Sequence, residues 1–476
     1  MFAFSFMDAG WPPEGGRRLC RYVALVWVLL TAAALAEDRP PSVGPLELAA
    51  SDRVLVLAPH PDDEVLGCGG VIQRCLAMRI PVRVVYFTYG DNNEWSFLIY
   101  RKHAVLLPGA VRQMGLLRHE EAVQAGKVLG LAPDQLDFLG YPDFGTHQIW
   151  REHWGSEPSF RSMLTRVVRV PYANAFRPGA PYSGEAIMQD LRSVLREFKP
   201  TKVFVSHPSD FNPDHQALFL FTQVTLWTLE KELRPGIYPY LVHFPGWPRP
   251  RGRQPSEPLV PPAALARSIE WRPLALTGNE VAVKESAIQR HKTQYAYAGN
   301  YLDSFIRTNE LFGDLPPLRF SAGGLFPAGL APKPEGDKEH EFAPLTESER
   351  ARFIGVEWRR IQVTDEALTV SITLSRPLAE AVSAEVQADG YRADRAFGTM
   401  PKIKVRIGRL EHEVLDQRRE VPASVVSVKR GLRELEVRIP WETLGHPERL
   451  FVSARTYMGD IPLDWVSWRV VDLRGN

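Results

Sequence analysis

Cysteine is scarce in this 476-residue chain, and none of its three cysteines is placed to form a disulfide. Cys20 falls in a leading segment that we expect to be removed. Cys68 and Cys75 lie on one predicted helix, about 10 Å apart by helical rise, which is too far to bridge without distortion. We therefore expect the fold to depend on a hydrophobic core, and the chain is long enough to bury one.

An excess of charge of one sign is lacking as well. The formal net charge is +1, without the basic excess that a nucleic-acid-binding protein needs. The sequence also lacks a G-x-S-x-G elbow, so it gives no support to a serine nucleophile. A hydrophobic fraction of 45% and a charged fraction of 24% are typical of globular proteins. The length predicts two or three domains.

Long apolar runs are limited to one stretch near the N-terminus. Tyr22 to Ala36 is apolar over 15 residues, follows Arg17 and Arg18, and ends in an A-x-A cleavage pattern. A bilayer span needs about 20 residues, so this run is short for one. We predict a signal peptide over residues 1–36 and an exported protein, periplasmic or extracellular, with no membrane span after its removal. An uncleaved N-terminal membrane anchor is the alternative.

Strand-like and helix-like segments alternate over residues 37–330. Short apolar runs predict buried strands, and apolar residues at helical spacing between them predict helices. The alternation predicts a Rossmann-like α/β fold, a mostly parallel sheet with helices on both faces. Residues 145–183 are expected to form an irregular insertion, and residues 295–312 a further helical stretch. The expected strands are 53–57, 82–88, 135–139, 202–206 and 268–276. The expected helices are 66–78, 113–130, 185–198, one from the loop that ends at His215 to about residue 232, and 279–292.

The pattern changes at residues 331–345, whose Pro-rich and charged composition indicates a linker. Short strand-like runs separated by turns recur over residues 346–476, with little helical periodicity. This pattern predicts an all-β sandwich as a second domain. The expected strands are 353–363, 368–374, 403–408, 424–428, 435–439, 450–457 and 465–471.

Two polar loops follow strands of the predicted parallel sheet. The first, Ala58 to Gly67, contains His60, Asp62 and Asp63, and the second runs from His207 to His215. Ligands bind at the carboxyl ends of the strands in open α/β sheets, so we expect both loops to lie at that edge. A capped turn at a helix start is the structural alternative for the first loop. A cap, however, needs one carboxylate and no histidine.

The side chains of these loops match the ligands of a catalytic zinc site, which keeps one position open for water. His60, Asp63 and His215 supply three ligands. Asp62, next to a ligand, is placed to accept a proton from water. Zinc with a carboxylate base is suited to hydrolysing an amide. The same set of ligands could instead hold Fe(II) as a facial triad, although the extra carboxylate favours hydrolysis.

Several motifs in order resemble the PIG-L/LmbE superfamily of zinc-dependent de-N-acetylases, whose members remove acetyl groups from N-acetylglucosaminyl units. The resemblance spans residues 52–313 and implies a Zn²⁺ cofactor. It rests on A-P-H-P-D-D-E at residues 58–64, Arg118 to Ala122, Phe138 to Asp143, Asp214-His215, Lys284 to Gln294 and Asn309 to Phe312.

The resemblance implies roles for residues beyond the three ligands and the base. Asp214 would support the ligands from a second layer, and Arg118 and Asp91 are candidates for the sugar pocket. The chain departs from the family at Asn212, where a histidine usually stabilises the oxyanion or carries a proton. Asn212 can donate a hydrogen bond but cannot carry a proton at neutral pH. Either it acts as a neutral donor, or His207 reaches the site, or activity is weak.

The C-terminal region weakly resembles family 9-like carbohydrate-binding and DOMON-type sandwiches. The cue is the segment Leu435 to Gly445, which contains Trp441, together with Trp465 and Trp468 near the end. Tryptophan faces can stack on sugars, which would let this region bind a polysaccharide. Equally, these tryptophans could be part of the sandwich core.

The sequence therefore predicts an exported, zinc-dependent hydrolase that removes N-acetyl groups from an N-acetylglucosamine-type sugar or glycoconjugate. A hydrolase of a non-sugar N-acyl compound is one alternative. A catalytically weak sugar-binding protein, with Asn212 marking a decayed site, is another.

Overall fold

The computed structural model describes residues 44–92, 107–155, 157–266, 268–319, 325–326, 346–459 and 461–474. The expected signal peptide and linker lie outside these ranges. Among the helices of the described ranges, none has both the length and the apolar composition that crossing a bilayer requires.

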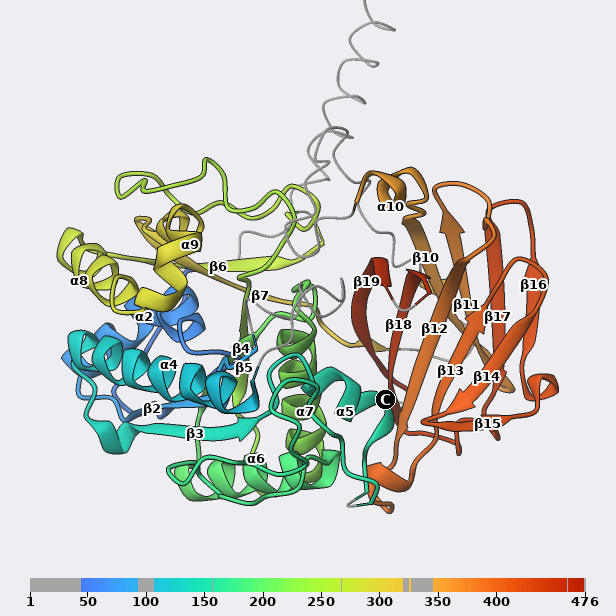
Figure 1. The fold of residues 1–476 in the computed structure, drawn as a ribbon, viewed down its shortest axis with the longest axis horizontal. Helices are drawn as coiled ribbons and strands as arrows, with labels where there is room; N and C mark the ends of the chain where they lie inside the picture. Colours follow the sequence, from blue (N-terminus) through green and yellow to red (C-terminus); the bar gives the residue numbers. More distant parts are fainter. Residues whose placement is uncertain are drawn as a thin grey trace, which may run out of the picture. The chain divides into compact units, whose positions relative to one another are not determined.

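Within these ranges, seven strands form the first sheet, in the order β3-β2-β1-β4-β5-β7-β6 (Figure 1). The first five strands in this order, from β3 at the edge to β5, run parallel to one another. The last two strands, β7 and β6, pair antiparallel at the other edge. The mostly parallel α/β fold is thus confirmed. The strands are β1 (Val54–Ala58), β2 (Val82–Thr88), β3 (Leu136–Tyr141), β4 (Lys202–Ser206), β5 (Gly236–Tyr240), β6 (Glu270–Ala275) and β7 (Asn309–Asp314).

The helices of this region form two packed groups. α2, α4 and α8 contact one another, and α5 and α6 each contact α7. Right-handed crossovers place the helices before β2 and β3 on one face of the sheet and those around β4 on the other. The helices are α2 (Asp63–Ala77), α4 (Pro108–Leu129), α5 (Thr146–Glu152), α6 (Gly184–Phe198), α7 (Pro213–Thr228), α8 (Gly278–Ile288) and α9 (Lys292–Leu302).

Local sequence sets several of the helix ends. The Ser183 side chain accepts a hydrogen bond from the N–H of Ala186 and caps α6. Thr277 and Glu280 form a capping box at the start of α8. Gly130, with φ of 98°, ends α4 in the left-handed conformation that glycine adopts without strain.

The expected helical stretch 295–312 is wrong beyond Phe305, where a short 3-10 helix ends, because Asn309–Asp314 is strand β7. Within it, the buried carboxylate of Glu310 accepts a hydrogen bond from the N–H of Gly70 at 2.7 Å and pairs with Nζ of Lys284 at 2.6 Å. These partners are distant in sequence, so local periodicity cannot reveal them. The sequence pattern also misses β5 and the helix α5 inside the insertion.

The described residues beyond 317 build two further sheets, which confirms an all-β region. Their orders are β16-β17-β11-β10-β9 and β15-β14-β13-β12-β18-β19-β8, and their facing sides enclose a second hydrophobic core. The strands are β8 (Leu318–Arg319), β9 (Leu325–Phe326), β10 (Val356–Val363), β11 (Ala367–Leu374), β12 (Val382–Tyr391), β13 (Lys402–Ile407), β14 (His412–Asp416), β15 (Arg419–Val421), β16 (Ser427–Arg430), β17 (Glu434–Pro440), β18 (Arg449–Met458) and β19 (Ile461–Asp472).

We call residues 44–314 the α/β part and residues 346–474 the β part. Helices α5 and α7 of the α/β part contact strands β12 and β18 of the β part through buried polar pairs and aromatic ring contacts. On β12, Asp389 accepts a hydrogen bond from Nε1 of Trp150 at 2.7 Å, and Glu385 pairs with Arg151 at 2.5 Å. This strand is absent from the sequence prediction because its polar side chains interrupt the apolar run.

Candidate metal centre

The first loop leaves the fully buried strand β1 and turns directly into α2. His60 and Asp63 lie three residues apart on this turn, and the backbone N–H of His60 donates to Oδ2 of Asp63 at 2.9 Å. Asp62 occupies the N-cap position with φ of 132°. This backbone conformation is strained for a residue with a Cβ, and such strain is concentrated at functional sites.

The second loop leaves β4 and enters α7, at the same sheet edge as the first. Asn212 caps α7, because its Oδ1 accepts from the N–H of Asp214 at 2.9 Å. Pro213 occupies the first helical turn, where its missing N–H costs nothing. Asp214 and His215 follow in that turn, and both are 0% exposed. The cap therefore places a carboxylate and an imidazole at the edge where β1 ends.

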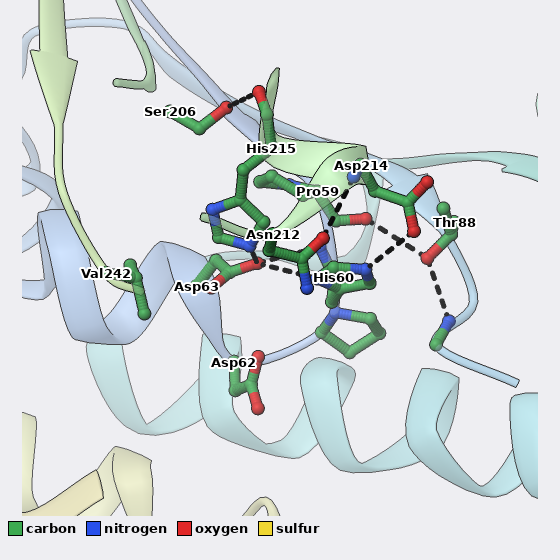
Figure 2. A network of polar contacts seen from close by, with 12 residues as sticks. Pro59, His60, Asp62, Asp63, Thr88, Ser206, Asn212, Asp214, His215 and Val242 are labelled. Carbon is green, nitrogen blue, oxygen red and sulfur yellow. Dashed lines mark hydrogen bonds and ion pairs between the residues drawn. The ribbon is translucent and has the colours of Figure 1, made fainter. Parts of the chain in front are cut away.

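His60, Asp63 and His215 come together as the sequence predicts (Figure 2). Oδ2 of Asp63 lies 3.2 Å from Nδ1 of His60 and 3.1 Å from Nε2 of His215. All three side chains are buried, and their potential ligand atoms lie within 4.8 Å of one another. Two imidazoles and a carboxylate at this spacing form a donor set that can hold a divalent metal.

The outer nitrogen of each imidazole faces further carboxylates. Nε2 of His60 lies 3.1 Å from Asp143 and 3.3 Å from Asp214, and Nδ1 of His215 lies 3.1 Å from Asp210. Burial alone would lower the pKa of both imidazoles. The carboxylates instead raise the pKa of His215 to about 9 and that of His60 well above its usual value. Carboxylates in this position fix the orientation of metal-binding histidines.

A second possible donor group, His60 with Asp143 and Asp214, uses the other nitrogen of the same imidazole. Most of its carboxylate oxygens already accept hydrogen bonds, and Oδ1 of Asp143 is the exception. Asp214 accepts from the N–H of Phe144 and from the N–H and hydroxyl of Thr146, and Asp143 accepts from the N–H of Asn92.

In the first group, each ring nitrogen of the buried His215 faces a carboxylate oxygen at 3.1 Å, but neither nitrogen makes a hydrogen bond of normal geometry within the described residues. A buried nitrogen without a hydrogen-bond partner is costly. A metal bound by His60, Asp63 and His215 would satisfy Nε2 of His215. Because three of the four carboxylate oxygens of the second group already accept hydrogen bonds, these three residues are the better fit, with Asp143 and Asp214 as neighbouring carboxylates.

Asp62 lies apart from the three donors in Figure 2. Its side chain is 12% exposed, against 1% for Asp63, so water can reach it. Oδ2 of Asp62 lies 3.5 Å from Nη2 of Arg118. Burial, opposed by Arg118, raises the pKa of Asp62 to about 7. A carboxylate with these properties is suited to exchange protons with a substrate near neutral pH.

Asn212 and His207 are the two candidates for the role of the histidine that the family usually carries, and they lie in different surroundings. Asn212 lies at the N-cap of α7, and capping uses its Oδ1 but not its amide nitrogen. His207 accepts from the N–H of Ser209 at 2.9 Å and stacks on Trp271, with ring centroids 5.7 Å apart. These contacts occupy Nδ1 and one face of the His207 ring.

Arg118 and Asp91 are both buried beside the first loop. Arg118 donates to the carbonyl oxygens of Pro61 at 2.7 Å and Gly90 at 2.9 Å. It thus holds together the loops that follow β1 and β2. Asp91 accepts from the hydroxyl of Tyr172 at 2.5 Å, and burial and nearby Asp143 raise its pKa to about 7. Both side chains are occupied by protein contacts.

Sequence reasoning misses four residues next to the donor group: Asp143, Asp210, His243 and His291. Asp143 and Asp210 lie in segments that the sequence analysis names, but no role follows from their spacing. The His243 ring lies 4.7 Å from that of His215, after the unpredicted strand β5. Nε2 of His291 lies 3.3 Å from Glu64, whose other oxygen accepts from the N–H of Asp62. A histidine or carboxylate just after each parallel strand is the signal that could find the first three.

Two of the three tryptophans noted in the β part are used in packing. Trp468 is 1% exposed and joins the core of the α/β part. Trp441 is partly buried against the second core, and its Nε1 donates to the carbonyl oxygen of Thr364 at 2.9 Å. Trp468 therefore offers no face for sugar stacking.

Residues 55–225 match the family model described as PIG-L: GlcNAc-PI de-N-acetylase. This region includes both loops of the donor group. A 1D-myo-inositol 2-acetamido-2-deoxy-alpha-D-glucopyranoside deacetylase of Corynebacterium glutamicum (strain R) is 27% identical over 207 residues, covering 41% of this chain and 63% of the relative. A Saccharopolyspora erythraea deacetylase 1 of the same description is 30% identical over 177 residues, covering 36% and 52%. Residues 55–225 of the α/β part are thus similar to PIG-L-type de-N-acetylases.

The chain spans less than two thirds of the length of these relatives. Among solved structures, it is similar to an N,N'-diacetylchitobiose deacetylase from Pyrococcus horikoshii. The identity is 19% and the TM-score 0.34, with 56% of this chain and 84% of the other covered.

Proposed function

We propose that this protein is a zinc-dependent hydrolase that removes the N-acetyl group from an N-acetylglucosamine-type sugar or glycoconjugate. The observation that carries the proposal is the buried His60–Asp63–His215 group with the more accessible Asp62 beside it. A metal with a neighbouring carboxylate base is the equipment for amide hydrolysis. The match of this region to PIG-L-type de-N-acetylases supports an acetamido sugar as substrate.

Nδ1 of His60, a carboxylate oxygen of Asp63 and Nε2 of His215 would hold the zinc. When bound, zinc acts as a Lewis acid that polarises the acetyl carbonyl and acidifies water. Asp62 accepts the proton of the water that attacks the carbonyl carbon. Asp62 then returns this proton to the amine nitrogen as the C–N bond breaks, and acetate and the free amino sugar are released.

Asn212 is the proposed donor to the carbonyl oxygen as negative charge develops there. Capping of α7 through its Oδ1 fixes the amide, and its nitrogen stays available as a donor. A neutral donor stabilises the oxyanion without any change of protonation. Asp62 then performs both proton transfers, so a histidine at position 212 is not required.

The test measures acetate release by the zinc-loaded full chain from N-acetylglucosaminyl glycosides, chitooligosaccharides and non-sugar N-acyl compounds. The account expects release from at least one acetamido sugar. Asp62→Asn should lower kcat by about 10²- to 10⁴-fold while zinc still binds. If acetate is released from the non-sugar compounds and from none of the sugars, the proposed sugar substrate is wrong. Undiminished release by Asp62→Asn would exclude Asp62 as the base.

A further inference from the structure

Strand β18 of the β part lies along helix α7, which carries His215. Near one end of the contact, Arg449 pairs with Glu230 at 2.5 Å, just beyond the end of α7. Near the other end, Arg455 donates to Oε1 of Gln216 in the first turn of α7. Six residues of strand span about 20 Å, and fourteen residues of helix about 21 Å. The two elements therefore run side by side over most of the length of α7.

Side chains between these two ends fill the contact. Phe451 of β18 stacks on Trp227 of α7, with ring centroids 4.6 Å apart and an interplanar angle of 18°. Phe451 is 0% exposed and belongs to the core of the α/β part. The face of β18 that points away from the core of the β part is thus buried, although such a face would be solvated in an isolated sandwich.

Arg455 reaches two residues that neighbour the metal-centre carboxylates. Its Nη2 donates to Gln216, and Gln216 donates to the carbonyl oxygen of Asp210 at 2.8 Å. The same Nη2 lies 3.1 Å from Nε2 of His147, which follows Thr146, a donor to Asp214. Burial and two nearby arginines lower the pKa of His147, so its neutral ring can accept this hydrogen bond.

We propose that Arg455 is a positioning residue for the metal centre. It ties the first turns of α5 and α7 to β18, so that Asp210 and Asp214 keep the imidazoles of His215 and His60 oriented. This inference rests on the proposed metal site. It makes the β part a structural support of that site, in addition to any role in binding substrate.

The test compares zinc affinity and thermal unfolding of the full chain for wild type, Arg455→Ala and Arg449→Ala, with a chromophoric chelator as competitor. Removing an outer support of a metal ligand costs about 10- to 100-fold in affinity. Arg455→Ala should therefore weaken zinc binding about 10-fold or more. Arg449→Ala is the matched control, on the same strand and the same helix but at the far end. It should lower the unfolding temperature and leave zinc affinity within about 3-fold of wild type.

Cobalt supplies a second readout, because the absorption spectrum of bound Co²⁺ reports ligand geometry. This spectrum should change in Arg455→Ala and stay unchanged in Arg449→Ala. Gln216→Met, which removes the acceptor and keeps the side-chain volume, should reproduce the loss of affinity if Arg455→Ala fails to fold. Equal zinc affinity in wild type, Arg455→Ala and Gln216→Met would overturn the inference, as would an equal loss in Arg449→Ala. A wild-type chain that binds no zinc would instead overturn the proposed metal site itself.

Discussion

Oδ2 of Asp210 lies 3.1 Å from Nδ1 of His215 and holds that imidazole from the side opposite Asp63. The same oxygen accepts from the N–H groups of Val242 and His243 at 3.1 and 2.9 Å. Asp210 therefore connects the proposed ligand to the strand end after β5. Neither spacing nor resemblance points to it, yet it is the carboxylate best placed to orient His215.

Replacement of Asp210 by Asn should weaken metal binding, because the amide presents one oxygen instead of two and removes a negative charge. The expected loss of zinc affinity is about 10- to 100-fold, measured by competition with a chelator. Asp52→Asn is a suitable control, since Asp52 is also buried but pairs with Lys202 at the opposite sheet edge. Unchanged zinc affinity in Asp210→Asn would show that Asp210 does not support the ligand.

The backbone at Asp62 yields a prediction on stability. With φ of 132°, this position carries a strain that glycine does not feel. Asp62→Gly and Asp62→Ala both remove the carboxylate, but only the glycine relieves the strain. The free energy of unfolding should be about 1 kcal/mol higher for Asp62→Gly than for Asp62→Ala, as measured by denaturant titration. Both variants should lack activity. Equal stability of the two would mean that the backbone is not strained here.

Because His207 is buried, we expect the free energy of unfolding to depend on pH. Burial lowers its pKa to about 3, and in the unfolded chain its pKa is near 6.5. The folded state thus keeps His207 neutral, while the unfolded state takes up a proton below about pH 6.5. The contribution of His207 is fully present above that pH and is lost towards pH 3, at about 1.4 kcal/mol per pH unit.

His207→Asn keeps an acceptor for the N–H of Ser209 and removes the titrating group. The neighbouring charges, Asp210 and Arg469, are the same in both proteins. Denaturation midpoints measured between pH 4 and pH 7.5 should therefore fall less steeply with acidification for the variant than for wild type. Parallel curves for the two proteins would contradict this prediction.

The parts of the fold that sequence predicts best depend on local pattern. Strands β2 and β4 match their expected bounds, because each is a short and mostly apolar run. The first loop is recognisable because His60, Asp62 and Asp63 are adjacent in sequence. The pairing with His215 follows from a general rule, since both loops end parallel strands at one sheet edge.

The remainder depends on contacts between residues that are distant in sequence. β7 is extended because Glu310 binds the backbone of α2 and Lys284, although its sequence is compatible with a helix. The polar side chains on one face of β12 are typical of a solvent-exposed strand, but in the structure residues of α5 cover this face. Asp143 reaches His60 only through the packing of β3 beside β2. No local sequence pattern predicts these contacts.

The central claim is that His60, Asp63 and His215 hold a metal on which amide hydrolysis depends. Its most direct test is acetate release from a substrate identified as above, measured while zinc is titrated into the chelator-treated full chain. The account predicts that release is near background without metal and rises to a plateau at one equivalent of zinc per chain. Full release by the metal-free protein, or none at any zinc concentration, would contradict it.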